Sequence, residues 1–200
     1  HRDKVKSFTA RELEHEIRRL LYLAGGGASP DEILQEAEAI CQLLITAGES
    51  AVSDALEFLE SGEDLPLAGR AGSDFDFQSL RLALIDTLQS IGGADVERGL
   101  FEQLQITDSP AEIEAISNAL DALQPAVYRD AILDVALARL ADLGTGQGPG
   151  HQVEAAPLFR VLQELGGEDI ASVLQRLPGW FDAYAAVSLA NLPGGGGIDR

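Results

Sequence analysis

The chain has 200 residues, a formal net charge of −19 and a single cysteine. This length is enough for one or two ordinary domains that each bury a hydrophobic core. One cysteine excludes an internal disulfide framework and a site built from several thiolates. No apolar run approaches the ~20 residues that would cross a bilayer.

The charge is unevenly spread along the chain. Residues 1–25 hold six Lys and Arg against four Asp and Glu, whereas residues 26–200 hold eight Arg, no Lys and 29 acidic residues. Nucleic-acid binding relies on cationic side chains that neutralise phosphates. We therefore expect no nucleic acid and no direct membrane contact, and a protein or peptide as the partner. The same charge also favours solubility.

The first predicted helix opens with a capping box from Thr9 to Glu12, in which a hydroxyl and a carboxylate satisfy reciprocal amide donors. Three glycines, Gly25 to Gly27, predict its end. We expect residues 1–28 to form an N-terminal capping helix. Its apolar face consists of Leu13, Ile17, Leu20, Leu21 and Ala24.

A helical hairpin is predicted over residues 29–60. Ser29-Pro-Asp-Glu32 is a second capping box, with proline at the first helical position, where no hydrogen bond is lost. Gly48 marks the turn between the two helices. Cys41 falls on an apolar stripe, so we expect a buried thiol that acts as a small hydrophobe. The two stripes consist of Ile33, Ala37, Ile40, Cys41 and Leu44, and of Val52, Leu56 and Leu59.

Residues 61–77 break this helical pattern. The segment SGEDLPLAGRAGSDFDF is acidic, rich in glycine and contains Pro66, which predicts a long surface loop. We expect Phe75 and Phe77 to anchor its end to the core. Loops of this length either carry function or are merely mobile, and the composition is compatible with both.

The strongest pattern in the chain is a repeated hairpin. Residues 84–100 read as helix, Gly-Gly turn, helix, and residues 158–174 repeat them with seven identities in 17 positions. The shared residues include three leucines, the two turn glycines and one aspartate. This repetition predicts hairpins at 78–105 and 152–177, which stack because each alone buries too little apolar surface.

Two further units complete the predicted array. The Ser-Pro-x-Glu cap recurs at Ser109 and opens a hairpin over 109–143, with Pro125 in its turn. Residues 143–151 contain four glycines and one proline, which predicts a segment without helix; they lack the spacing of a phosphate-binding loop. Residues 180–200 resemble the start of a fifth unit. Because the chain contains no methionine, even at position 1, we expect a fragment of a larger protein.

The unit Leu-x-x-Leu/Ile-Gly-Gly-x-Asp-Val/Ile-x-x-x-Leu at 84–100 and 158–174 resembles the HEAT-repeat family, including the short bacterial type that also occurs in phycobilin lyases. The resemblance covers residues 29–192. It implies an all-α fold, a right-handed α-α superhelix of about four and a half hairpins, in one domain over residues 1–200. Aligned leucines are 44, 32 and 42 residues apart. This irregular spacing leaves an armadillo-like or general helical array as alternatives.

The resemblance also implies which residues face a partner. In a HEAT-like array the second helices of the hairpins line the concave face, and each helix exposes the residues between its apolar positions. The partner-binding residues expected on this basis are Asp54, Glu57, Glu97, Arg98, Gln175 and Arg176.

No catalytic or metal-binding motif accompanies this scaffold. His1, His15 and His151 lack the spacing of metal ligands, and no serine has a nucleophile-elbow setting. The leading interpretation is a non-catalytic protein-interaction scaffold, without cofactor or metal, that holds a protein or peptide on its concave face. The alternatives are a HEAT-type enzyme or ligand-binding domain similar to bilin lyases, and a purely structural spacer. The composition of such a soluble domain is compatible with a cytoplasmic location and with an extracytoplasmic one.

Overall fold

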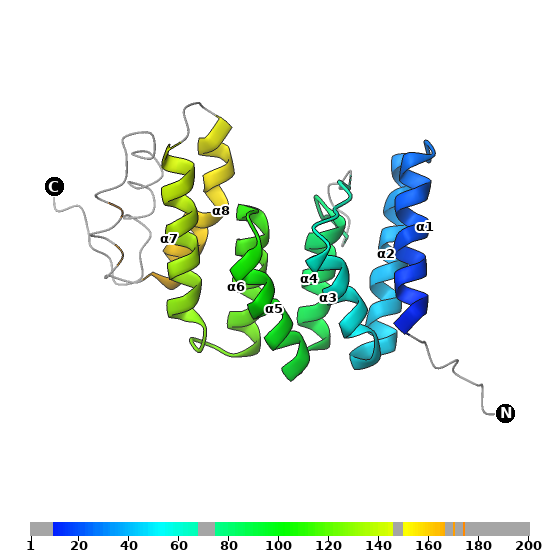
Figure 1. The fold of residues 1–200 in the computed structure, drawn as a ribbon, viewed down its shortest axis with the longest axis horizontal. Coiled ribbons are helices and arrows are strands. Elements are labelled where there is room, and N and C mark those ends of the chain that lie inside the picture. The colour runs from blue at the N-terminus through cyan, green and yellow to red at the C-terminus, as the bar shows by residue number, and fades with distance from the viewer. Residues whose placement is uncertain (1–9, 68–74, 146–149, 167–169, 171–173, 175–200) are drawn as a thin grey trace. The chain divides into compact units, whose positions relative to one another are not determined.

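The computed structural model describes residues 10–67, 75–145, 150–166, 170 and 174 (Figure 1). Within them the fold contains eight α-helices, one short 3-10 helix and no strand. An isolated antiparallel bridge joins Pro66 to Ser79. The predicted all-α class is therefore confirmed. The chain divides into two compact units, His1–Gln103 and Leu104–Arg200.

The first unit packs its helices in an alternating order. Helix α1 lies against α2 and α3, and α2 lies against α4 (Figure 1). A helix thus contacts both its neighbour in the chain and the helix after that. The elements are α1 (Ala10–Gly25), α2 (Pro30–Ala47), the 3-10 helix η1 (Gly48–Ala51), α3 (Val52–Glu60), α4 (Leu80–Ile91) and α5 (Ala94–Ile106), which continues past the end of the unit.

The second unit contains α6 (Pro110–Leu123), α7 (Arg129–Thr145) and α8 (Gly150–Leu165), which all pack on one another. Its core includes Phe159, which is fully buried, and leucines from α6 and α8. The bidentate pair between Arg160 of α8 and Glu114 of α6 adds a polar contact at the edge of this core.

The leucines of the repeated motif lie in the cores of these units. Leu84, Leu88 and Leu100 are fully buried in the first unit, and Leu158 and Leu162 are fully buried in the second. A buried leucine side chain contributes about 1.5–3 kcal/mol relative to an exposed one. The apolar positions that define the repeat therefore supply core contacts in both units.

Local sequence signals explain where the helices begin. The Ser29 side chain accepts a hydrogen bond from the Glu32 backbone, and the Glu32 carboxylate accepts one from Ser29 N at 2.8 Å. This confirms the predicted capping box. At α6 the Ser109 side chain likewise accepts from Glu112 N, whereas the Glu112 carboxylate accepts from the Thr107 hydroxyl at 2.7 Å.

A buried arginine holds the described ends of the loop after α3. Arg81 is only 5% exposed, and its guanidinium donates to the carbonyl oxygens of Leu59 at 2.6 Å and Glu63 at 3.4 Å. The last carbonyls of a helix have no partner within that helix. Arg81 therefore joins the end of α3 to the start of α4.

Paired backbone bonds and two aromatic rings hold the same segment. Leu67 N donates to Gln78 O, and Leu80 N donates to Leu65 O, both at 2.9 Å. Phe75 is buried and meets Phe77 edge-to-face, with ring centroids 5.0 Å apart. The prediction that these phenylalanines anchor the loop is confirmed for Phe75, while Phe77 stays partly exposed. Residues 68–74 of the predicted loop lie outside the described residues.

Gly99 of α5 leaves room for the Leu56 side chain of α3. A Cβ at this position would overlap the Leu56 side chain, lying 2.6 Å from its Cδ2 and 2.9 Å from its Cγ. Leu56 is therefore the contact residue of α3 toward α5, although it is only partly buried. The interpretation of Leu56 as part of the apolar stripe of α3 is in line with this contact.

Three expectations need correction. Leu34, not Ile33, is the first buried residue of α2; Leu34 precedes the buried Ala37 by three residues and Ile33 by four, and both spacings fit one helix face. The glycine-rich segment 143–151 was expected to hold no helix, but α7 extends to Thr145 and α8 begins at Gly150. The apolar packing of both helices overrides the weak helix propensity of glycine there. Pro157 consequently lies inside α8 rather than near its start.

Several other expectations fall on residues that the structure does not describe. They are the Thr9 cap, most of the second helix of the hairpin at 152–177, and the fifth unit at 180–200. The single domain over residues 1–200 also stays a prediction.

Truncation of a central leucine should show how much the first unit depends on its core. We expect Leu88→Ala to lower the free energy of unfolding by about 2–5 kcal/mol, because it deletes buried methyl groups and leaves a cavity. Urea denaturation of the chain measures this loss. Ile45→Ala is the matched control, since Ile45 is 47% exposed on α2 and should lose less than about 1 kcal/mol. Equal losses in the two variants would contradict the core position of Leu88.

Candidate functional site

A cleft with an acidic lining lies between α1 and α3 in the first unit. It has a volume of about 120 Å³, roughly that of four water molecules at liquid density. Its walls come from α1, α3 and the first residues of the following loop. The lining residues are Glu14, Ile17, Arg18, Leu21, Asp54, Glu57, Phe58, Ser61 and Glu63.

Helical periodicity brings the polar residues of this cleft together. Asp54 and Glu57 are three residues apart on α3 and therefore share one face of that helix. Glu14 and Arg18 are four residues apart on α1 and form an ion pair at 2.6 Å. Their side chains are 52% and 76% exposed, so this pair lies at the rim and contributes little to stability.

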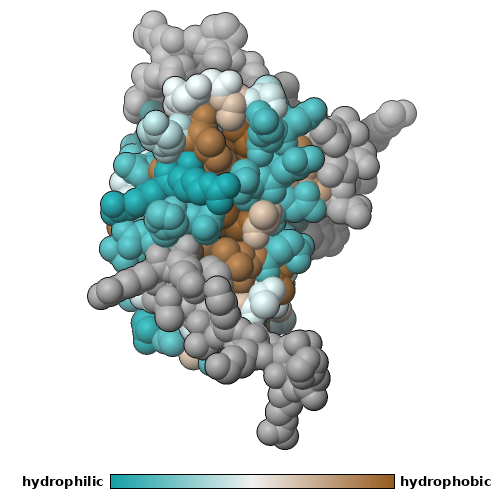
Figure 2. Space-filling model, turned by 90° about the vertical axis from the view of Figure 1, so that its right-hand side faces the viewer, coloured by the Kyte–Doolittle hydropathy of each residue, from teal (hydrophilic) through white to brown (hydrophobic). Residues whose placement is uncertain are grey.

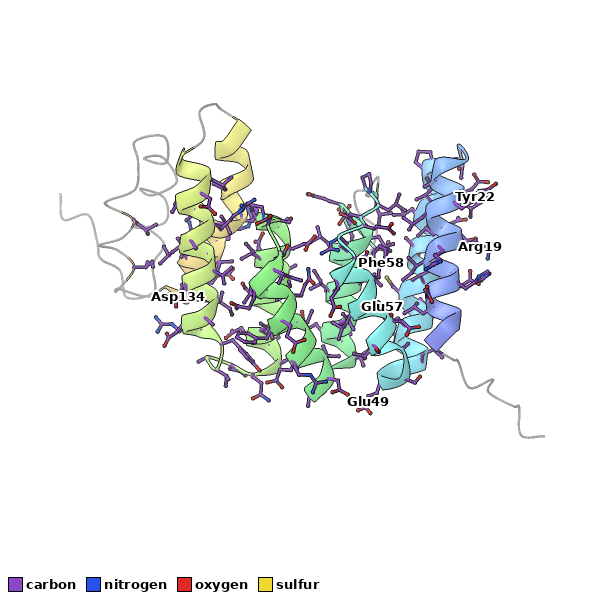
Figure 3. All side chains as sticks on the ribbon, in the orientation of Figure 1. Arg19, Tyr22, Glu49, Glu57, Phe58 and Asp134 are labelled. Carbon is purple, nitrogen blue, oxygen red and sulfur yellow. The ribbon has the colours of Figure 1, made fainter. Side chains whose placement is uncertain are left out.

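The floor of the cleft is apolar. Ile17 of α1 and Phe58 of α3 are buried core residues, and Leu21 is partly exposed one turn beyond Ile17. Figure 3 labels Glu57 and Phe58 on α3, the helix that packs on α1. The cleft thus combines a hydrophobic wall with carboxylates at its edge.

Asp54 has the most unusual environment in the cleft. Its Oδ2 atom is shielded from solvent and has no hydrogen-bond partner among the described residues. Burial raises the pKa of this carboxyl above its ordinary value, and the nearby charges of Glu57 and Glu14 raise it further. A shielded carboxylate oxygen without a donor is energetically costly. The folded chain therefore bears this cost at Asp54.

The structure brings only part of the predicted site together. Asp54 and Glu57 share the cleft between α1 and α3. Glu97 and Arg98 lie on α5 and do not line this cleft, and Arg98 forms an exposed ion pair with Asp95 at 2.6 Å. Gln175 and Arg176 lie outside the described residues.

The sequence pattern does not predict the α1 side of the cleft. Glu14 and Arg18 belong to a helix that was interpreted as a cap, and no partner residue was expected there. A signal was present in the spacing, since residues 14 and 18 follow the buried positions 13 and 17 by one. They therefore lie beside the surface that α1 packs against its neighbours.

A second hollow lies at the far end of α1. Its volume is about 600 Å³, and it is more open than the first. Tyr22, at 81% exposure, stands at its edge. In Figure 3, Arg19 and Tyr22 project away from the rest of the first unit. Arg19 bridges Glu16 and Glu36 across this surface, and Figure 2 shows apolar patches interrupted by polar side chains.

The single cysteine does not form part of either hollow. Cys41 is buried on α2, as predicted, and burial raises the pKa of its thiol to about 11. Such a thiol stays protonated at neutral pH and is a poor nucleophile. Among the described residues, no cluster of three or more His, Cys, Asp or Glu could hold a metal ion. No helix in that part of the chain is long and apolar enough to cross a membrane.

We compared the chain with protein-family models, with curated proteins and with solved structures, and none of the three comparisons found a match. The resemblance to HEAT repeats therefore stays a proposal that depends on the residues themselves.

The strained carboxylate predicts a substitution that stabilises the chain. We expect Asp54→Asn to unfold at higher urea concentration than the parent chain at pH 7, because it removes a charge that burial and the carboxylates of Glu57 and Glu14 disfavour. Among the described residues that line the cleft, Glu63 adds a further carboxylate and Arg18 a cation. A raised pKa means that the folded chain binds its proton more tightly than the unfolded chain. Ionisation therefore lowers stability as pH rises from the unfolded pKa, about 3.9, through the folded one.

The gain should be largest above that window and should vanish below it, where Asp54 is protonated in both states. Urea midpoints at pH 7 and at pH 3 measure the difference between variant and parent. Glu38→Gln on the exposed side of α2 is the control and should give no comparable gain. A less stable Asp54→Asn at pH 7 would mean that Asp54 makes a stabilising bond.

Proposed function

We propose that the chain is a non-catalytic protein-interaction scaffold of the HEAT-like type, in which stacked helical hairpins present a surface to a protein or peptide. The alternating order supports this arrangement, since α1 packs on α3, α2 on α4 and α6 on α8. In a solenoid each hairpin covers the apolar face of the preceding one in this way. The buried repeat leucines support it as well.

One observation carries the interaction role. The cleft between α1 and α3 gathers four carboxylates and one guanidinium around an apolar floor. A protein gains no stability from a shielded Asp54 oxygen without a donor. Residues that destabilise the free fold are found at functional sites more often than elsewhere.

The enzyme alternative receives no support from a specific observation. An enzyme similar to bilin lyases would need a pocket with convergent thiol or polar groups. The single thiol of the chain is buried and stays protonated at neutral pH. The spacer alternative predicts that the loop after α3 fills the groove. Its described ends bond instead to one another and to the start of α4.

Selection from a displayed library of random peptides tests the interaction role. We expect the parent chain to enrich a set of peptides. These peptides should bind a double variant, Asp54→Asn with Glu57→Gln, at least about tenfold more weakly than they bind the parent, which corresponds to about 1.4 kcal/mol. The matched control carries Glu38→Gln and Glu102→Gln, two exposed carboxylates outside the cleft, and should bind as the parent does.

Direct binding of the enriched peptides is measured by isothermal titration at low micromolar to millimolar concentration. Failure to enrich any peptide, or equal affinity for the parent and the cleft variant, would contradict a partner-binding role for this cleft.

A further inference from the structure

Helix α3 lies in a stretch of the chain that carries only one sign of charge. Residues 20–69 hold ten Asp and Glu and no Lys, Arg or His. Asp54, Glu57 and Glu60 belong to α3 itself, and Glu57 and Glu60 are exposed in its last turn. We propose that α3 is an ionic-strength-sensitive element: like-charge repulsion destabilises it at low salt, and screening by salt stabilises it. This inference does not depend on a partner.

Two local rules make the last turn of α3 unfavourable for these charges. Side chains three residues apart are neighbours on a helix surface, and like charges on neighbouring positions repel each other. The C-terminal end of a helix also carries a partial negative charge, so cations stabilise it and anions do not. No basic residue occupies the last turn of α3, which the structure describes in full. Glu57 and Glu60 are therefore opposed by each other and by the helix that carries them.

The described elements packed against α3, which are α1, α4 and the 3-10 helix η1, offset little of this repulsion. From α1, Arg18 and Glu14 line the same cleft but pair with each other at 2.6 Å. From α4, Arg81 donates to the Leu59 carbonyl oxygen at the end of α3 at 2.6 Å. From η1, Glu49 adds a further carboxylate. The cation of Arg81 thus faces one end of α3 only.

Asp54 is in line with a negative potential along the helix. Burial raises the pKa of its carboxyl, and the charges of Glu57 and Glu14 raise it further. The two carboxylates that act on Asp54 come from α3 itself and from α1. Repulsion therefore reaches across the contact between these two helices as well as along α3.

Helix α3 is also short enough to respond to its charges. It has nine residues, and isolated helices of fewer than about 12–15 residues are marginal in water. Its order thus depends on packing through its buried residues, among them Phe58 and Leu59. By contrast, α4 has twelve residues, of which seven are buried, and no acidic residue in its first turn. Elements held by fewer buried contacts open locally before the rest of a fold does.

Salt acts on the repulsion more than on the ion pair beside it. The Debye length is about 30 Å at 0.01 M salt and about 3 Å at 1 M. Neighbouring side chains on one helix have Cβ atoms roughly 5–6 Å apart, whereas the Arg18 and Glu14 side chains are in contact at 2.6 Å. Raising the salt over this range therefore removes most of the repulsion and leaves much of the contact pair.

Hydrogen exchange of single backbone amides, followed by NMR on the full chain at pH 7, tests the proposal. We expect protection of the Leu56, Phe58 and Leu59 amides to rise roughly fivefold or more between about 0.01 M and about 1 M sodium chloride, which is the size expected from two last-turn charges and one like-charged pair. The Leu84 and Leu88 amides of α4, in the same sample, should change less than about twofold. Equal changes in the two helices, or none in α3, would overturn the proposal.

Matched variants separate α3 from the net charge of the chain. Glu57→Gln with Glu60→Gln should raise the protection of the α3 amides at low salt and remove most of their salt response. The control, Asp130→Asn with Asp134→Asn, removes the same amount of charge from exposed positions of α7 in the second unit. It should leave the α3 response as in the parent chain. A control that removes the response equally would mean that net charge alone acts, and the assignment to α3 would be wrong.

A second salt distinguishes screening from a bound ion. Sodium chloride and potassium chloride give the same Debye length at equal concentration, so both should protect α3 to the same extent. A response to only one of them would indicate a cation held at a particular position and would contradict repulsion as the cause.

Discussion

The burial of leucine ridges between successive helices is the constraint on which the rest of the molecule depends. A single helix of this chain has an apolar stripe on one side only, and two helices of one hairpin cannot cover both stripes completely. The first unit solves this by packing α1 on α3 and α2 on α4. Each helix thereby gains a second apolar neighbour, and side chains such as Leu44, Leu84 and Leu88 become fully buried.

The same packing creates the cleft. Helices that meet along a leucine ridge leave their flanking residues beside the contact, and these residues define a shallow valley between the helices. At the contact between α1 and α3 the flanking positions are occupied by acidic residues, Glu14 on one side and Asp54 and Glu57 on the other. The fold requires only the ridge, and any polar side chain would keep the valley solvated. The carboxylates at these positions are the residues to which we propose a recognition role.

Sequence patterns predicted the local structure better than the site. The cap at Ser29, the Gly-Gly turn at residue 92 and the buried leucines of the repeat depend on neighbouring residues, and short-range rules describe them well. The cleft depends on α1 meeting α3 across about 40 residues of chain, which no local pattern encodes. We predicted Asp54 and Glu57 because they lie on the helix face that was expected to line the groove. Glu14 was not, since its role depends on which helix packs beside it.

The failures within the fold have equally specific causes. Ile33 was predicted as the first residue of the α2 stripe in place of Leu34, because both residues are apolar and periodicity alone does not separate them. Gly150 begins α8 although glycine disfavours helices, because the propensity cost of about 1 kcal/mol is smaller than the gain from burying residues such as Leu158 and Phe159. Tertiary packing decided both cases.

The arginines have one further consequence for the behaviour of the molecule in solution. Arg81 binds carbonyls at the end of α3, and Arg129 binds those of Leu165 and Gly166 at the end of α8. Arg18, Arg19, Arg98, Arg139 and Arg160 each pair with a carboxylate. All arginines whose side chains the structure describes thus have a local partner, and the excess of carboxylates gives the chain its net charge of −19. Any cationic molecule is then attracted over distances set by the Debye length, about 8 Å at physiological salt. The ionic strength of the compartment would change the rate of encounter more than the lifetime of the complex.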